Sequence, residues 1–473
     1  MKLYNRIRIV LASVALAMGA CALHAATIED ARRLAEDGNL DDAIEMLRKL
    51  EAEQPKDAEI PKLLGDYYMA VGEDDNARDA YELARKKGSR DAILGLAEMA
   101  NLSYDVDGAR GLVEEYRKTL KKGKRVLAED ESGDLVDRID RIDNALDRVE
   151  MIEVVDSLVV DAEDFFRHYR LSPEAGSLNA TDVLPEGFEA ADPTVVYEPE
   201  SGPYHLAAAP GANGTFGLFS SSALYGDTWE QPVSLGDGLG GWGDANYPFL
   251  MPDGVTLYFA SDGEESLGGL DLFISRRGDD GFLQPQNLGM PYNSPYDDYM
   301  LAIDEFTGAG WWASDRNRIP GKVTIYIFVP QELRKNVDPD SPDLVARARM
   351  NAIRTTWNEG TDRQALLDKI SAISTDRKSA AHQFEIYIPG RGVVTSFNEF
   401  RNPASREAMH AYQVGIAKVK DAERRLASLR AAYAKGDHDN ADTISSLERE
   451  LEKARAGLVG LRNNVIEAET ETE

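Results

Sequence analysis

Hydrophobic residues recur with two different periods along this chain, and the changes of period predict its main divisions. From residue 27 to 150 apolar residues return every three to four positions, which is the spacing of helices that bury one face. From 152 to about 331, short runs of β-branched and aromatic residues are separated by turn residues, which predicts strands. From 404 to 470 the helical spacing returns. The pattern predicts a multidomain α + β protein.

The N-terminal helices contain an internal repeat. The segment from Asn39 to Ala43 recurs 34 residues later, from Glu73 to Ala77, and a weaker third copy follows. Small residues fall where paired helices approach each other and large ones where a core needs filling: Gly65, Ala77 and Ala84, and Leu64, Tyr68 and Tyr81. These positions closely resemble the tetratricopeptide repeat (TPR), which implies a short α-solenoid over residues 27–150. A plain helical bundle is the alternative.

The first helix of the second repeat carries the candidate partner-binding residues Lys62, Asp66 and Met69. In a solenoid the inner helix of each repeat lines a concave groove, which commonly holds a peptide or a partner helix. Because acids outnumber bases by 83 to 53, a basic or mixed partner is expected there.

The β region repeats with a period of 53 residues. Ala260-Ser261-Asp262 is followed 53 residues later by Ala313-Ser314-Asp315, and the segment 231–236 precedes its match at 284–289 by the same interval. Three copies are visible between about 190 and 331. In the middle copy, Pro252-Asp253-Gly254 predicts a hairpin turn, because proline fixes φ and glycine accepts positive φ.

Three to four short antiparallel strands per copy correspond to one propeller blade. The repeat resembles the WD-repeat-like β-propeller family with a Ser-Pro-Asp-Gly turn, although Met251 replaces the serine. Three blades are too few for an ordinary ring, so the strands expected at 154–160 and 384–395 are candidates for a fourth, closing blade. The segment 341–381 is expected to be a helical insertion in this domain, which spans 152–400.

The C-terminal segment, residues 404–470, predicts two helices joined by a turn at 436–439. Its apolar residues alternate spacings of three and four, as in a coiled-coil seam: Tyr412, Ile416, Val419, Leu426 and Leu429, and then Ile444, Leu447, Leu451, Leu458, Leu461 and Val465. The short turn favours an antiparallel hairpin, with pairing between two molecules as the alternative.

The first 25 residues have the order of a secretory signal peptide. Lys2, Arg6 and Arg8 precede an apolar run, and small residues follow it up to Ala26. Cys21, the only cysteine, follows Met18-Gly19-Ala20 in a sequence similar to a bacterial lipobox, so it is a candidate for lipidation. No later stretch is long and apolar enough to predict a membrane span.

Composition limits the classes of ligand and of site that this chain can be expected to have. The 473 residues carry a formal net charge of -30, which opposes binding to nucleic acid. Six histidines and one cysteine leave little material for a zinc site or a disulfide framework, and neither a cofactor nor a metal is expected.

Catalytic and binding candidates each have a structural alternative. Asp262, Asp271 and Asp315 could act as paired carboxylates or calcium ligands, but Asp262 and Asp315 share a repeat position and are better explained as turn acceptors. The tryptophans Trp229, Trp311 and Trp312 could stack on a sugar or pack in a core. Five histidines lack ligand spacing and are interpreted as single packed or solvated residues: His168, His205, His382, His410 and His438.

The order of segments along the chain resembles that of cell-envelope proteins of the Bacteroidetes type: a signal peptide, then TPR-like repeats, then propeller-like blades. Those relatives often end in a peptidoglycan-binding domain, which this chain replaces by the helical hairpin. The resemblance implies a non-enzymatic scaffold or adaptor of the periplasm or outer membrane, with envelope proteins or peptides as partners. A propeller that binds glycan or peptidoglycan fragments is the second hypothesis, and an envelope hydrolase is the third.

Overall fold

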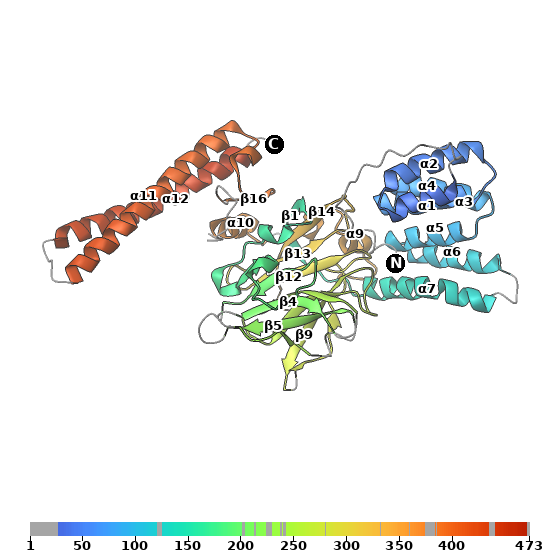
Figure 1. Cartoon of the computed structure of the whole chain (residues 1–473), viewed down its shortest axis with the longest axis horizontal. Helices are drawn as coiled ribbons and strands as arrows, with labels where there is room; N and C mark the ends of the chain where they lie inside the picture. Colours follow the sequence, from blue (N-terminus) through green and yellow to red (C-terminus); the bar gives the residue numbers. More distant parts are fainter. Residues whose placement is uncertain are drawn as a thin grey trace.

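A computed structural model describes residues 27–470 with internal gaps at 121–124, 201–203, 212–213, 224–228, 237–238, 240–242, 280, 332, 359, 374–383, 385 and 435–439. The predicted signal segment and Cys21 lie outside the described residues. An N-terminal helical region is followed by a largely antiparallel β domain and then by two long C-terminal helices (Figure 1). This order confirms the predicted division into helical, β and helical parts.

The helical region contains α1 to α7, each packed on the next one: α1 (Ile28–Glu36), α2 (Leu40–Glu53), α3 (Glu59–Val71), α4 (Asp74–Lys86), α5 (Asp91–Leu102), α6 (Val106–Lys118) and α7 (Arg125–Leu146). Contacts also join α3 to α5 and α5 to α7, so alternate helices lie side by side.

The small positions of the helical repeat have a direct structural cause. A Cβ atom on Gly65 would lie 2.5 Å from the Tyr81 ring, and one on Gly95 would lie 2.6 Å from the same ring. The buried Tyr81 ring on α4 therefore fits between α3 and α5 only because both neighbours are glycines. Gly72, with φ +84°, ends α3 in the left-handed conformation that glycine adopts without strain.

Strands of the β domain form three larger antiparallel sheets within the described residues. The first has the order β2-β3-β4-β5-β6, the second β10-β9-β8-β7 with β11 on β9, and the third β1-β14-β13-β12. Their bounds are β1 (Glu153–Asp161), β2 (Ser177–Asn179), β3 (Val196–Glu198), β4 (Tyr204–Pro210), β5 (Phe216–Ser222), β6 (Val233–Ser234), β7 (Ala245–Leu250), β8 (Thr256–Ser261), β9 (Asp271–Gly278), β10 (Gly281–Phe282), β11 (Gln286–Asn287), β12 (Asp298–Asp304), β13 (Ala309–Ser314) and β14 (Lys322–Val329).

The 53-residue repeat is visible in the backbone. Strands β7 and β12 each carry a register shift, at Asn246/Phe249 and at Tyr299/Ala302. Tyr247 and Met300, 53 residues apart, both have positive φ at these shifts, 54° and 53°. Such bulges re-aim the strand and increase its twist, so the second and third sheets start with the same deformation.

The arrangement of the outer strands differs from the prediction of a fourth unit. β1 pairs along its length with β14 and completes the third sheet. β15 (Ile386–Ile388) and β16 (Gly392–Val394) form a separate two-stranded sheet. The segments 154–160 and 384–395 therefore do not form a blade together. The reason is that β14 offers β1 a partner of matching length with a continuous apolar face.

Aromatic side chains fill the space where β7 and β12 meet. Phe165, in the short 3-10 helix η2 (Phe165–His168), is buried and makes edge contacts with Tyr247 and Tyr299 at centroid distances of 6.0 and 5.1 Å. The two tyrosines stack on each other at 4.8 Å. The hydroxyl of the buried Tyr169 donates to the Met300 carbonyl over 2.8 Å. Residues just after β1 thus belong to the core of the β domain.

The helical region and the β domain share a hydrophobic core. Ala97 and Tyr104 of the helical region belong to one buried cluster with Leu267 and Met290 of the β domain. The guanidinium of Arg318 pairs with Asp74 on α4 and donates to the Met69 carbonyl on α3. Buried apolar contact and a charged contact together hold the two parts as one body.

The C-terminal helices α11 (Pro403–Ala434) and α12 (Ala441–Thr470) lie antiparallel and project away from the β domain (Figure 1). Leu426, Leu447 and Leu451 are buried between them. At the base, Glu469 near the end of α12 accepts the backbone N–H of Arg401 just before α11. The predicted insertion contains two short helices, α9 (Leu344–Arg349) and α10 (Arg363–Ala372), and the 3-10 helix η5 (Ile353–Thr356). Among the described helices, none has both the length and the apolar content needed to cross a membrane.

Candidate interaction surfaces

The predicted partner-binding residues lie on α3 but make contacts within the chain. Lys62 Nζ lies 2.6 Å from Asp66 Oδ2, and the Tyr81 hydroxyl donates to Asp66 Oδ1 over 2.8 Å. The Lys62 and Asp66 side chains remain 29% and 32% exposed. Met69 packs against the helical core, and its carbonyl accepts the bond from Arg318. Lys62 and Asp66 thus form a preorganised, partly exposed ion pair, whereas Met69 lies at the contact with the β domain.

Two of the predicted carboxylates have the same structural task in successive sheets. Asp262 Oδ1 accepts the backbone N–H of Asp244 over 2.7 Å, and Asp315 Oδ1 accepts that of Asp297 over 2.9 Å. These bonds support the interpretation of both residues as acceptors fixed by the repeat.

Asp244 and Asp297 in turn link neighbouring sheets. The Asp244 carboxylate accepts the N–H of Phe216 at the start of β5 over 2.7 Å. The Asp297 carboxylate accepts the N–H of Leu270, just before β9, over 2.9 Å. Two carboxylates in series therefore connect each sheet to the preceding one by hydrogen bonds, Asp262 with Asp244 and Asp315 with Asp297. The sequence motif pointed to Asp262 and Asp315 but did not reveal these partners.

The third candidate carboxylate, Asp271, is fully buried at the start of β9. Its Oδ2 atom accepts the N–H of Leu267 over 3.0 Å and an amide hydrogen of Asn287 over 2.7 Å. Burial raises the pKa of Asp271 well above its ordinary value. This environment is that of a packing carboxyl at the junction of β9 and β11, and its Oδ1 atom is buried without a hydrogen-bond partner in the described part of the chain.

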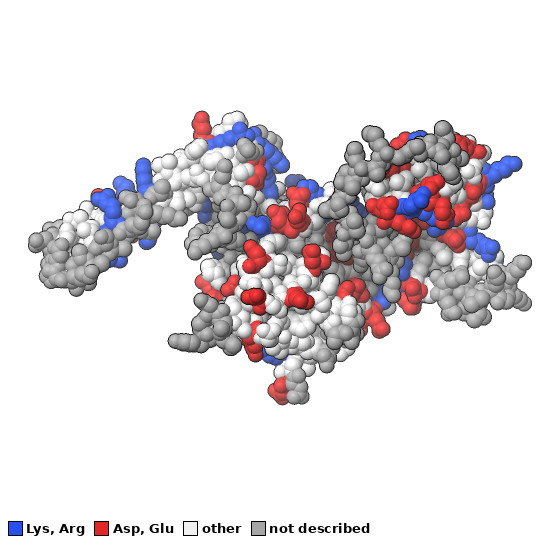
Figure 2. Space-filling model, viewed as in Figure 1, with Lys and Arg blue, Asp and Glu red and all other residues white. Residues whose placement is uncertain are grey.

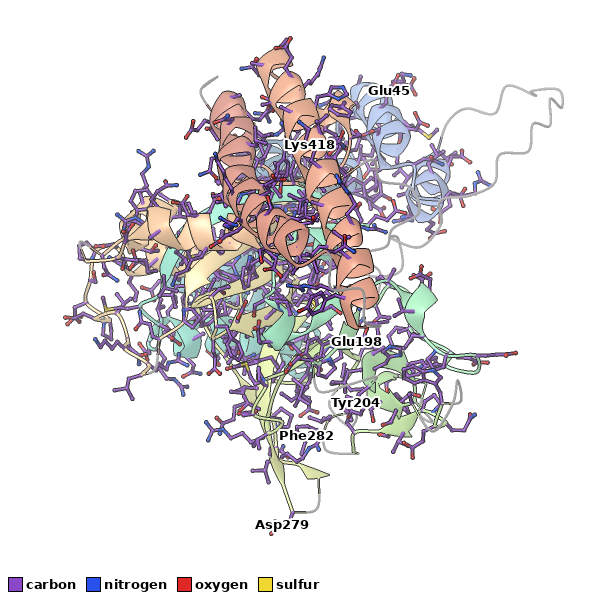
Figure 3. All side chains as sticks on the ribbon, turned by 90° about the vertical axis from the view of Figure 1, so that its left-hand side faces the viewer. Glu45, Glu198, Tyr204, Asp279, Phe282 and Lys418 are labelled. Atoms are coloured by element: carbon purple, nitrogen blue, oxygen red, sulfur yellow. The ribbon has the colours of Figure 1, made fainter. Side chains whose placement is uncertain are left out.

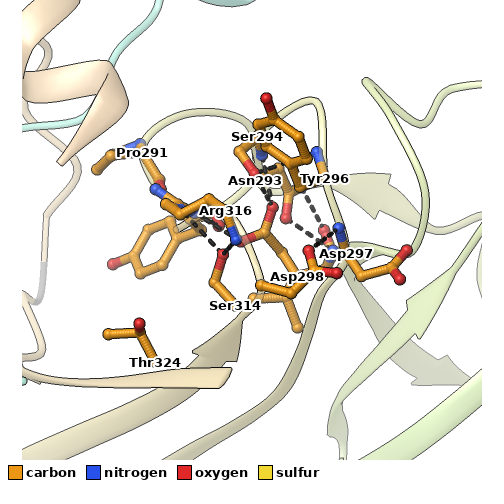
Figure 4. A network of polar contacts seen from close by, with 12 residues as sticks. Pro291, Asn293, Ser294, Tyr296, Asp297, Asp298, Ser314, Arg316 and Thr324 are labelled. Carbon is orange, nitrogen blue, oxygen red and sulfur yellow. Dashed lines mark hydrogen bonds and ion pairs between the residues drawn. The ribbon is translucent and has the colours of Figure 1, made fainter. Parts of the chain in front are cut away.

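A buried ion pair, missed by sequence reasoning, lies beside this junction. Arg316 and Asp298 are both buried, with Arg316 Nη2 2.6 Å from Asp298 Oδ1 (Figure 4). Asp298 Oδ2 accepts from the Ser294 hydroxyl over 2.6 Å, and Arg316 also donates to the carbonyls of Pro291 and Tyr292. Burial raises the pKa of Asp298 although Arg316 acts against that shift. Arg316 has Gly263 as its counterpart in the preceding copy, so the repeat pattern gave no signal for it.

Histidine and tryptophan candidates are dispersed. Trp311 and Trp312 are fully buried in β13, which leaves Trp229 as the partly exposed one. The Trp229 ring stacks on the buried His205 ring at 4.3 Å. His168 accepts a backbone bond from Val393, His410 stacks on Phe397, and His382 and His438 lie outside the described residues. In the described part of the chain, no three His, Cys, Asp or Glu side chains converge as metal ligands would.

A groove of about 380 Å³ lies on the third sheet. Its floor contains two cross-strand pairs of β1 and β14, Ser157 with Tyr326 and Val159 with Thr324. The wall is the segment 350–354, which ends with the exposed Arg354. Val159 is 54% exposed, which is unusual for a valine in the middle of a strand. Sequence reasoning did not identify this groove because β1 had no assigned neighbour.

Charge is distributed unevenly over the molecule. Residues 403–470 carry 11 acids and 11 bases, so the acidic excess belongs to the rest of the chain. Figure 2 shows acidic side chains over the helical region and the β domain, and basic ones along the visible face of the C-terminal hairpin. A second projection is the β9–β10 ribbon, where Asp279 and Phe282 lie at the end far from the helices (Figure 3).

Comparison with known proteins found no match to any family model, curated protein or solved structure.

Proposed function

We propose that this protein is a non-enzymatic scaffold or adaptor of the bacterial periplasm or outer membrane, and that it binds other proteins through a TPR-like solenoid and a propeller-like β domain. The observation that carries the proposal is the joining of two repeat-built parts into one body by the shared core around Tyr104 and by Arg318. A rigid body with two different surfaces can hold two partners at a fixed separation.

The assignment to these repeat classes rests on the spacing of packing residues. In the helical part, Tyr81 seated between Gly65 and Gly95 supports the 34-residue repeat. In the β part, the bulges at Tyr247 and Met300 support the 53-residue repeat. Both patterns describe modules that function elsewhere mainly as binding surfaces.

The hydrolase hypothesis is weakened by the positions of its candidate residues. Asp262 and Asp315 each accept a backbone N–H, and Asp271 is fully buried. The glycan-binding hypothesis loses Trp311 and Trp312 to the core and is left with Trp229, whose ring already stacks on His205. The scaffold hypothesis requires neither a free catalytic carboxylate nor an exposed tryptophan that stacks on a sugar.

A charge exchange on α3 tests the adaptor function. In Lys62→Glu/Asp66→Lys an ion pair is kept, but the charges presented on the predicted partner face are reversed. Because this exchange also removes the acceptor of the Tyr81 hydroxyl, circular dichroism and the thermal midpoint must first show that the variant is folded like the parent. The matched control is Glu45→Lys/Lys49→Glu, which exchanges a pair of the same spacing and distance, 2.6 Å, on α2. Full-length tagged chains are purified from envelopes of the producing cells, and co-purifying proteins are quantified by mass spectrometry.

We expect the α3 exchange to lower the amount of specific co-purifying partners at least fivefold. The α2 exchange should leave that amount unchanged. Equal partner sets for wild type and both exchanged chains would contradict a binding role for this face. Retention of peptidoglycan fragments in place of proteins would favour the glycan hypothesis.

The proposed location rests on the Lys2 to Ala26 pattern and is tested by fractionation. An exported chain is expected in the periplasmic or outer-membrane fraction. Cys21→Ala should move it from membrane to soluble periplasm if Cys21 is lipidated. An unchanged distribution would eliminate the lipid anchor, and a cytoplasmic chain would eliminate the signal peptide.

A further inference from the structure

β1 is an edge strand with one side paired and the other open. It pairs with β14 on one side and ends the order β1-β14-β13-β12. The ladder continues at Ala162, whose N–H donates to the Gly321 carbonyl over 3.0 Å. In an antiparallel pair, alternate residues direct both backbone groups at the partner strand, and the residues between them direct both groups away. Since Ala162 faces β14, the backbone groups of Ser157, Val159 and Asp161 point outward.

Part of this outer edge is occupied by the chain itself. Val154, before the bulge, donates its N–H to Thr356 Oγ1 over 3.0 Å and accepts from Trp357 Nε1 over 2.8 Å. The N–H of Ser157 donates to the carboxylate of Asp156 over 2.8 Å, which agrees with its outward direction. Within the described chain, the outward groups of Val159 and Asp161 have no such partner.

The groove adjoins this open stretch. Ser157 and Val159 contribute both to the groove floor and to the open edge. An added strand would therefore find backbone donors and acceptors along the edge and room for side chains above Val159. This combination of a free ladder and a side-chain pocket is the basis of binding by strand addition.

The charge of the β1 edge distinguishes between possible occupants, although the groove itself is lined by one base, Arg354, and by no acid. Residues 153–164 contain five acids and no base: Glu153, Asp156, Asp161, Glu163 and Asp164. Glu153 is paired with Arg363 and Asp161 with Lys322, whereas Glu163 is exposed at the open end of the edge. A second copy of the chain would bring an equally acidic edge and another net charge of -30, so repulsion opposes self-pairing.

We propose that the outer edge of β1 binds an extended segment of a partner protein as an added strand, with an apolar side chain above Val159 and a basic residue near Asp161 and Glu163. This deepens the proposed adaptor function by assigning its β domain a mode of binding. Exposed edges are normally protected against pairing. Here η5 and Asp156 protect one end and leave the other free.

The test uses the full chain and two probes. The first probe is the fluorescent peptide Lys-Thr-Val-Thr-Val-Thr-Lys, and the second has the same sequence with alternate backbone amides methylated. Hydrogen exchange resolved to single residues is measured with and without each probe, and affinity is measured by fluorescence anisotropy. In the free chain, the amides of Val159 and Asp161 should exchange fast, whereas those of Leu158 and Val160, which face β14, should be protected.

The first probe should slow exchange at Val159 and Asp161 at least tenfold, and the methylated probe should not. Val159→Pro removes an outward N–H without removing a bond to β14, and should weaken binding about tenfold, the effect of about one hydrogen bond. Asp161→Asn/Glu163→Gln, which leaves the edge backbone intact, should weaken binding of the lysine peptide and reduce its salt dependence.

Protection of the Val159 amide in the free chain, or equal binding of the two probes, would overturn the inference. Protection that grows with protein concentration alone would also overturn it, because the occupant would then be a second copy. If the probe binds while the α3 charge exchange leaves all partners in place, the result contradicts the proposed binding role of the α3 face. Strand addition at β1 would still be supported.

Discussion

Single residues in the turns of the repeat determine whether the strands can pair. Gly254 has φ +68° in the turn between β7 and β8, and no atom lies within 4 Å of where its Cβ would be. The Asp253 carboxylate accepts the N–H groups of Val255 and Thr256, both over 2.8 Å. Residue 254 is therefore constrained by its backbone conformation, whereas there is room for a larger side chain.

Gly254→Val should lower the thermal midpoint, because a β-branched residue at positive φ costs about 1 to 3 kcal/mol. Gly254→Asn is the matched control, since asparagine tolerates the left-handed region. Differential scanning calorimetry of the full chain should place the asparagine variant close to the parent. Equal midpoints for the valine variant and the parent would show that the turn does not need positive φ.

The buried pair of Arg316 and Asp298 makes a sharper prediction about stability. Arg316→Met leaves a buried carboxylate without its cation and should destabilise the β domain by about 3 to 5 kcal/mol. Arg316→Met/Asp298→Asn removes both charges and should recover more than half of that loss. Urea unfolding followed by tryptophan fluorescence measures both, because Trp312 stacks at 4.7 Å on Tyr326, the ring over which Arg316 lies. A double variant no more stable than the single one would contradict this account of the pair.

At the scale of elements, the β15–β16 hairpin attaches the C-terminal part to the β domain through two acceptors. His168 Nδ1 accepts the N–H of Val393 over 3.0 Å, and the Asp156 carboxylate accepts that of Gly390 over 2.9 Å. Burial lowers the pKa of His168 from its ordinary 6.5, which keeps the ring neutral and able to accept. Burial also raises the pKa of Asp156.

The sign of the pH effect follows from the direction of the His168 shift. A histidine whose pKa is lowered in the folded state contributes stability above pH 6.5 and loses it as the pH falls through the folded pKa. The raised pKa of Asp156 acts in the opposite direction, so the comparison must isolate His168. His168→Asn retains an acceptor without the titration. The parent should lose stability relative to this variant as the pH falls below about 6.5, as measured by thermal midpoints across pH. Parallel pH profiles would contradict the role of His168.

Much of the fold at this scale could be predicted from the sequence. The 34-residue spacing indicated paired helices because Gly65 and Tyr81 must fit together, and the 53-residue spacing indicated repeated strands. The place of β1 could not be predicted, because its pairing with β14 joins segments more than 160 residues apart and the sequence did not distinguish this pairing from a fourth blade shared with the segment 384–395. The groove and the Arg316–Asp298 pair depend on such long-range contacts, so they too required the structure.

The molecule as a whole is one acidic body with a charge-balanced helical hairpin projecting from it (Figure 1). The helical region is fixed to the β domain by the cluster around Tyr104 and Met290. Partners bound on α3 and on β1 would therefore be held in a constant relative position. A scaffold of this kind would fix the distance between its two partners.

Photo-cross-linking in living cells tests whether both surfaces, the α3 face and the β1 edge, bind partner proteins. A photoreactive amino acid is placed in the full-length chain at Lys62 on α3, at Val159 on β1, and at the exposed Lys86 on α4 as the matched control. Cross-linked species are identified by mass spectrometry. Discrete protein adducts are expected from positions 62 and 159, and none of comparable yield is expected from position 86. Adducts of equal yield from all three positions, or none from 62 and 159, would contradict binding at these two surfaces.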